Sequence, residues 1–186
     1  TPATTATPAT TVAPQLVDLL YPEAGEPLAR IVIPRIGVDK VVVEGVEPDD
    51  LRKGPGHFPD TPLPGQDGNA AIAGHRTTYG APFGDIDKLE PGDEIRVTTV
   101  QGEFVYTVAG QQIVQPEQVE VVDDFGDNRL TLSACHPKFS AAQRIIVWAE
   151  LQGEPVATVP RPTDRRTIDV TPTTVPPVTA VPPSSS

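Results

Sequence analysis

Short segments rich in apolar residues, each closed by proline or glycine, recur along the middle of this 186-residue chain. Two lie within residues 29–45, where Pro34 and Gly37 separate them, and the others lie within 69–76, 84–99, 102–114, 129–135 and 143–151. Helical pattern is confined to a turn or two in 48–56 and to the start of 84–99. Strand-like segments at such short spacing predict an all-β domain, either a barrel or a sandwich.

Segments rich in proline and threonine flank this middle part. Residues 1–15 consist almost entirely of Thr, Pro and Ala, and residues 152–186 contain eight of the 23 prolines. Such segments cannot bury enough apolar surface to offset the chain entropy lost on folding. We therefore expect a disordered linker over 1–15, one folded domain over 16–151 and a disordered tail over 152–186.

The formal net charge of the chain is −11. The charges of the two flanking segments cancel, so the folded domain carries all of it. An acidic surface repels phosphate groups and anionic lipid headgroups. We therefore expect no binding to nucleic acid.

No apolar run approaches the ~20 residues that a membrane-spanning helix needs. The sequence begins with Thr1 rather than Met, and a Thr/Pro spacer is typical of the connection between an anchor and a folded domain. We expect an N-terminal anchor that is missing from this sequence.

Cys135 is the only cysteine, so an internal disulfide is excluded. A lone cysteine is most often a small buried hydrophobe. Strand alternation over 129–135 places Leu130, Leu132 and Ala134 on the core face and Cys135 on the more polar one. Because Cys135 also ends its strand, the sequence favours a nucleophile at this position.

A cysteine nucleophile needs a proton partner, and the chain offers His57, His75 and His136. His136 follows Cys135 directly, but adjacent strand residues point to opposite faces, unless a bend at Pro137 changes this. His57 lies in a Pro/Gly-rich segment, where we expect it to pack or to be exposed. His75 ends a short apolar strand, as Cys135 does, and is either this partner or a hydrogen-bonded histidine at the rim.

Arg144 supplies a candidate cation. In the segment 143–151 it alternates with the apolar set Ile145, Val147, Ala149 and Leu151, so it lies off the core face. The eight residues between Cys135 and Arg144 allow the two to lie side by side on neighbouring strands. The alternative is an ordinary salt-bridge partner.

Several other chemistries are excluded. One cysteine with three scattered histidines gives no zinc spacing, and no glycine-rich phosphate loop is present. The acidic runs 47–50 and 122–128 lack the ligand spacing of a calcium loop. We expect neither a cofactor nor a metal.

The segments that carry these residues resemble the sortase family. "TLSAC" at 131–135 is similar to the sortase signature Thr-Leu-x-Thr-Cys, "GHR" at 74–76 precedes it, and Arg144 follows the cysteine by nine residues. The resemblance covers residues 30–151, and the ending "CHPKFSAAQRIIVWAEL" is most similar to class E sortases of actinobacteria. The chain departs from the signature at Ala134, where the family usually has Thr or Ser.

This resemblance implies a closed eight-stranded β-barrel with short helices and a cysteine transpeptidase. Cys135 would attack a Leu-Pro/Ala-x-Thr-Gly sorting signal between Thr and Gly, His75 would transfer protons, and Arg144 would bind the oxyanion. Thr131, Ser133 and Ala134 would line the substrate groove.

The resemblance also implies the partners and the location. The partners would be the sorting-signal peptide of secreted surface proteins and an amine of a peptidoglycan precursor, with the enzyme a monomer at the outer face of the plasma membrane. A pilin polymerase or hydrolase on the same barrel, and a non-catalytic wall-associated binding module, are the alternatives.

Overall fold

The computed structural model describes residues 19–161, so the expected linker over 1–15 and the tail beyond residue 161 lie outside the described part. The strands are β1 (Pro27–Ile33), β2 (Val38–Glu44), β3 (Gly56–His57), β4 (Asn69–Ala73), β5 (Glu94–Thr99), β6 (Gly102–Val114), β7 (Arg129–His136) and β8 (Gln143–Leu151). The short helices are η1 (Pro34–Ile36), α2 (Pro48–Leu51), η2 (Ile86–Lys88) and η3 (Val119–Val122).

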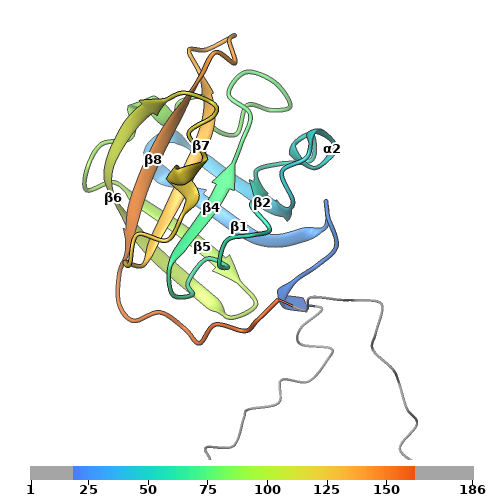
Figure 1. Ribbon diagram of the computed structural model, residues 1–186, viewed down its shortest axis with the longest axis vertical. Coiled ribbons are helices and arrows are strands. Elements are labelled where there is room, and N and C mark those ends of the chain that lie inside the picture. Colours follow the sequence, from blue (N-terminus) through green and yellow to red (C-terminus); the bar gives the residue numbers. More distant parts are fainter. Residues whose placement is uncertain (1–18, 162–186) are drawn as a thin grey trace, which may run out of the picture.

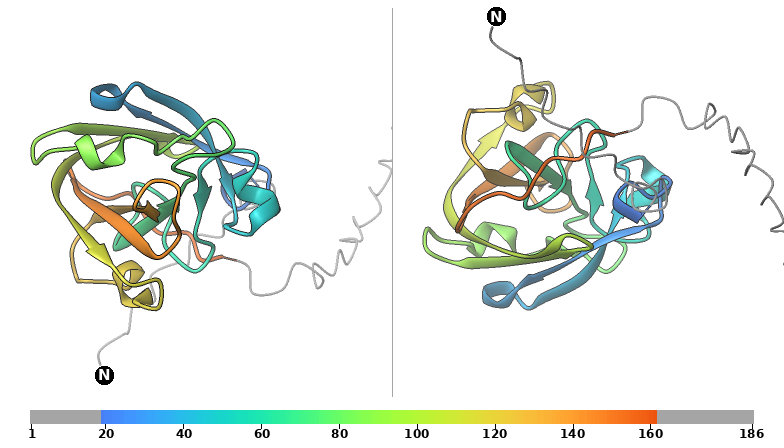
Figure 2. Two further views of the ribbon diagram at one scale, coloured as in Figure 1. Left: turned by 90° about the horizontal axis from the view of Figure 1, so that it is seen from above. Right: turned by 90° about the horizontal axis from the view of Figure 1, so that it is seen from below.

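The strands close into a barrel in the order β1-β2-β3-β4-β7-β8-β6-β5 (Figures 1 and 2). Two neighbouring pairs, β2 with β3 and β4 with β7, run parallel, and the other pairs are antiparallel. The eight-stranded barrel confirms the predicted fold class and excludes the sandwich.

Alternation along the strands builds the core, as the sequence predicted. On β7, Leu130, Leu132 and Ala134 are buried, whereas Ser133 and Cys135 are partly exposed. The same period-two pattern on the other long strands buries Ile31, Ile33, Ile95, Val97, Phe104, Tyr106, Val108, Ile145, Val147 and Ala149.

The folded part extends beyond Leu151, where the sequence predicted a disordered tail. Residues 152–161 run across one end of the barrel toward the first described residues (Figure 1). The backbone N–H of Val156 donates to the Gly65 carbonyl at 2.8 Å, and the Tyr21 hydroxyl donates to the Val159 carbonyl. The predicted boundary is therefore wrong for 152–161, because a proline-rich segment can still pack where a preformed surface supplies the partners.

Among residues 19–161, no helix has the length and apolar character that crossing a membrane requires.

Candidate active site

The parallel pair β4 and β7 brings two of the predicted site residues to the same edge of the barrel. Ala73 pairs with Ser133, and the Gly74 N–H donates to the Ser133 carbonyl at 2.9 Å. His75 and Cys135 each follow this pair by two residues. Parallel strands end at the same edge of a sheet, and β4 and β7 both end at the upper end of the barrel in Figure 1. His75 and Cys135 therefore belong to the same edge.

Gly74 is required at the end of β4 by its packing. A Cβ at this position would lie 2.5 Å from the ring of Phe83, which is fully buried under the turn that follows. The absence of a side chain therefore lets Phe83 pack directly against the backbone that carries His75, while the Phe83 N–H donates to the His75 carbonyl at 3.0 Å.

Cys135 and Arg144 are directly opposed residues of the antiparallel pair β7 and β8. The thiol is free and partly exposed. Cα atoms of opposed residues in such a pair are about 5 Å apart. The inference from strand alternation that these two residues lie side by side is confirmed.

The Arg144 guanidinium is held by backbone rather than by a carboxylate. Its Nη1 donates to the carbonyls of Ala141 and Gln143, each at 3.0 Å. None of the ion pairs found within residues 19–161 includes Arg144. The salt-bridge alternative is therefore not realised, and the charge remains available to a ligand.

The His75 imidazole is partly buried beside Tyr79, with ring centroids 4.9 Å apart. Its Nε2 is buried and has no hydrogen-bond partner among the described groups. Burial, and to a lesser extent the positive charge of Arg52, lowers the pKa of His75 below its ordinary value. The neutral ring is thus favoured.

His136 is engaged elsewhere. Its Nδ1 lies 2.9 Å from Nη1 of Arg76, and because a guanidinium can only donate, this nitrogen must be the acceptor. Arg76 is buried and forms an ion pair with Asp87 of η2 at 2.7 Å. Arg76 belongs to the "GHR" motif, but the sequence did not indicate its hydrogen bond with His136, because the two residues are 60 positions apart.

A cavity of about 210 Å³ lies beside Arg144. Its walls are formed by Phe58, by Ser133 of β7 and Ile146 of β8, and by residues of the segment 114–122, which ends in η3. The lining is mostly apolar, with Val114, Val119, Val121 and Val122 among its members. A cavity with this lining suits an apolar side chain of a ligand.

Of the three positions predicted for the groove, Ser133 lines this cavity and the other two do not. Thr131 is 1% exposed and donates to Asn69 Oδ1 at 2.8 Å. Ala134 is 3% exposed and packs into the core, because strand alternation turns it away from the cavity. The departure from the family signature at Ala134 therefore changes a core position. Phe58 was not predicted, since nothing in its local sequence marks it.

Within residues 19–161, no group of three or more His, Cys, Asp or Glu side chains is arranged to hold a metal ion.

A free thiol opposed to an arginine, with a histidine at the same edge of a barrel, is an arrangement typical of enzymes that use cysteine as a nucleophile. The chain belongs to the sortase family of cysteine transpeptidases, because the Sortase domain model matches residues 31–152.

Similar proteins agree with this assignment. Sortase D of Bacillus subtilis is 33% identical over 134 residues, which cover 69% of this chain and 66% of that protein. Sortase SrtE1 of Streptomyces coelicolor is 36% identical over 148 residues, which cover 71% of this chain and 42% of that protein. The chain thus spans less than two thirds of the length of either relative. The structure of sortase E from Streptomyces avermitilis matches with a TM-score of 0.65 and 40% identity, over 72% of this chain and 93% of that one. The similarity to class E sortases predicted from the sequence is confirmed.

Proposed function

We propose that this protein is a sortase transpeptidase that cleaves a Leu-Pro/Ala-x-Thr-Gly sorting signal between Thr and Gly. The observation that carries the proposal is the opposed pair of Cys135 and Arg144, at the edge where His75 also emerges. The apolar cavity beside Arg144 supports a peptide substrate.

In the first half-reaction, the Cys135 thiol passes its proton to the neutral His75 ring, and the resulting thiolate attacks the carbonyl carbon of the Thr residue. The carbonyl oxygen becomes an oxyanion, and the Arg144 guanidinium donates hydrogen bonds to it. His75 gives a proton to the nitrogen of the leaving glycine as the C–N bond breaks. The products are a thioester on Cys135 and a free glycine amine.

In the second half-reaction, an amine attacks the thioester carbonyl. His75 removes a proton from this amine, Arg144 again binds the oxyanion, and the Cys135 thiolate leaves. The acceptor is an amine of a peptidoglycan precursor, and water in its place gives hydrolysis. Arginine suits its role because its charge persists at any working pH.

The setting follows from this chemistry. The enzyme acts as a monomer at the outer face of the plasma membrane, held by an N-terminal anchor, on secreted surface proteins. The proposed reaction on peptides uses no cofactor.

The test is intact-protein mass spectrometry after incubation with a sorting-signal peptide. We expect an adduct on Cys135 that equals the peptide up to its Thr, and none on Cys135→Ala. Adding an amine should convert the adduct to the amide product. A pilin polymerase would transfer the fragment only to a pilin lysine, and a binding module would give no adduct at all.

A further inference from the structure

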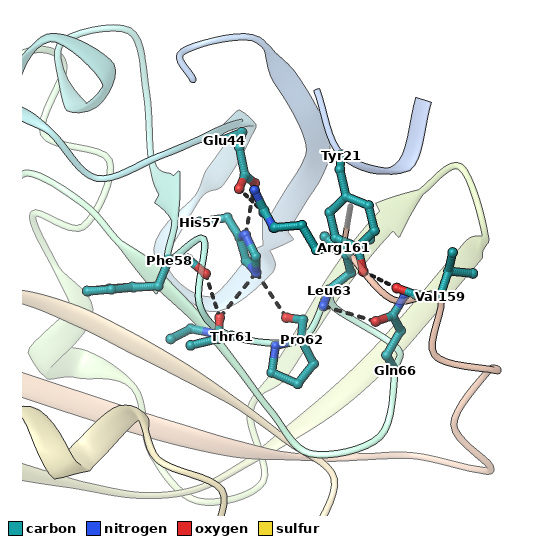
Figure 3. Close-up of polar contacts among 11 residues, drawn as sticks. Tyr21, Glu44, His57, Phe58, Thr61, Pro62, Leu63, Gln66, Val159 and Arg161 are labelled. Carbon is teal, nitrogen blue, oxygen red and sulfur yellow. Dashed lines mark hydrogen bonds and ion pairs between the residues drawn. The ribbon is translucent and has the colours of Figure 1, made fainter. Parts of the chain in front are cut away.

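A buried ion pair joins the segment after β8 to the barrel. Arg161 lies beyond residues 31–152, which match the family model. Its guanidinium contacts Oε1 of Glu44, at the end of β2, and lies over the ring of Tyr21 at 4.8 Å (Figure 3). Glu44 is only 2% exposed. Burial alone would raise the pKa of Glu44, but His57 and Arg161 more than offset this effect and lower it. Glu44 is therefore a carboxylate.

His57 connects this carboxylate to the loop that follows β3. The ring is completely buried, with Nδ1 2.9 Å from Glu44 Oε2 and Nε2 2.9 Å from the Pro62 carbonyl (Figure 3). A carboxylate and a carbonyl can only accept hydrogen bonds. These two contacts fix the orientation of the ring between β2 and the loop 58–62. The arrangement depends on Glu44 being ionised.

Thr61 connects the His57 ring to the backbone of Phe58 through hydrogen bonds. The Thr61 hydroxyl donates to the Phe58 carbonyl at 2.8 Å and accepts from the Ala71 N–H at 3.1 Å. Because its proton is used in the first bond, its oxygen can only accept from His57 Nε2, which lies 3.2 Å away. Phe58 in turn forms a wall of the cavity that Ser133 and Arg144 line. A continuous series of polar contacts thus runs from the C-terminal segment to the groove.

We propose that Arg161 is a positioning residue for the sorting-signal groove, acting through Glu44, His57 and Thr61 on the wall formed by Phe58. This inference rests on the function proposed above. Removing Arg161 leaves Oε1 of the buried Glu44 carboxylate without its partner, so Glu44 holds the His57 ring less firmly and the loop 58–62 loosens. Arg161 touches neither the substrate nor the reacting atoms, so its effect falls on peptide binding.

The test compares Arg161→Ala with the unchanged chain in a steady-state peptide cleavage assay. We expect KM for the peptide to rise roughly five- to tenfold while kcat changes less than about twofold, the pattern of lost binding that is common to ground and transition states. Arg161→Lys should restore part of the difference, because a cation again faces Glu44. Arg30→Ala is the matched control, since Arg30 pairs with Asp39 of β2 in an exposed ion pair, and should leave KM unchanged.

Thr61→Val keeps the proposal testable if Arg161→Ala does not fold. This variant keeps the shape of the side chain but removes the oxygen that links His57 to Phe58, so KM should rise in the same way. A lower melting temperature with unchanged KM in both variants would show that the segment only stabilises the fold, and an unchanged KM in Thr61→Val alone overturns the proposed contact series. If instead the unchanged chain forms no adduct with the peptide, the proposed function fails and not this inference.

Discussion

At the scale of single residues, the structure distinguishes His75 from His136, two histidines that the sequence offers as proton partners of Cys135. His75 has a buried, unpartnered nitrogen, whereas His136 accepts a hydrogen bond from the buried Arg76. This hydrogen bond already occupies the lone pair on Nδ1 of His136.

We therefore expect His75→Ala to lower kcat/KM by about 10²–10⁴, the usual contribution of a general acid–base group. His136→Ala should cost less than about tenfold, and mostly in stability. Peptide cleavage rates and melting temperatures of both variants measure this difference. Equal losses of kcat/KM in the two variants would show that the assignment of proton transfer to His75 is wrong.

Arg144→Lys keeps the positive charge but loses the fork of donors that an oxyanion needs. We expect kcat to fall about 10²- to 10³-fold, the range for loss of an oxyanion donor. Arg96→Lys, on the exposed side of β5 where Arg96 pairs with Glu94, is the control and should be neutral. A fully active Arg144→Lys enzyme would contradict the assigned role.

The pH dependence of His75 follows from its surroundings. Its pKa is lowered in the folded state, so between the folded and unfolded values the unfolded chain binds more protons. Its contribution therefore favours the unfolded state increasingly as pH falls through the ordinary histidine value. NMR titration of the His75 ring should give a pKa below the ordinary value of about 6.5. Arg52→Gln should raise this pKa by removing a nearby charge, and a midpoint that does not move would exclude the Arg52 effect.

At the scale of elements, the long strands were predictable because alternation is a local signal. The strand β3 was not, since its two residues, Gly56 and His57, lie in a Pro/Gly-rich segment and pair with residues distant in sequence. The same limit applied to the site. Motif spacing identified Cys135, His75 and Arg144, whereas the roles of Arg76 and Phe58 arise from contacts between distant segments, which no local pattern encodes.

The end of β4 offers a test of element packing. Gly74→Ala places a Cβ against the Phe83 ring, and we expect a loss of about 1–3 kcal/mol in the free energy of unfolding, as for other overpacked sites. Activity should fall too, because His75 follows directly. Gly74→Ala combined with Phe83→Leu should recover part of the stability of Gly74→Ala, measured by denaturant unfolding. If the loss of unfolding free energy in the double variant equals the sum of the losses in the two single variants, the clash with Phe83 is not the cause.

At the scale of the whole molecule, the C-terminal segment belongs to the folded unit as far as Arg161. Ending the chain after Gln152 removes Arg161 from Oε1 of Glu44 and the Val159 carbonyl from the Tyr21 hydroxyl. We expect this to cost at least about 2 kcal/mol, because each of these two groups then loses one of its partners. Ending the chain after Arg161 should leave the free energy of unfolding unchanged. Urea unfolding of the two truncated chains beside the full one tests this, and equal stability of all three would contradict it.

The opposed pair of Cys135 and Arg144 has a consequence for how such an enzyme can diversify. Hydrogen bonding between β7 and β8 sets the spacing of Cys135 and Arg144, the proposed nucleophile and oxyanion partner. The connection over 137–142 contributes the Ala141 carbonyl, which holds the Arg144 guanidinium. Insertions or deletions before Ala141 therefore keep this spacing while they reshape the surface beside it, where Phe139 is 90% exposed. Selection of new acceptors can proceed by changing loop length at a fixed catalytic distance, and so can engineering of the enzyme as a ligase.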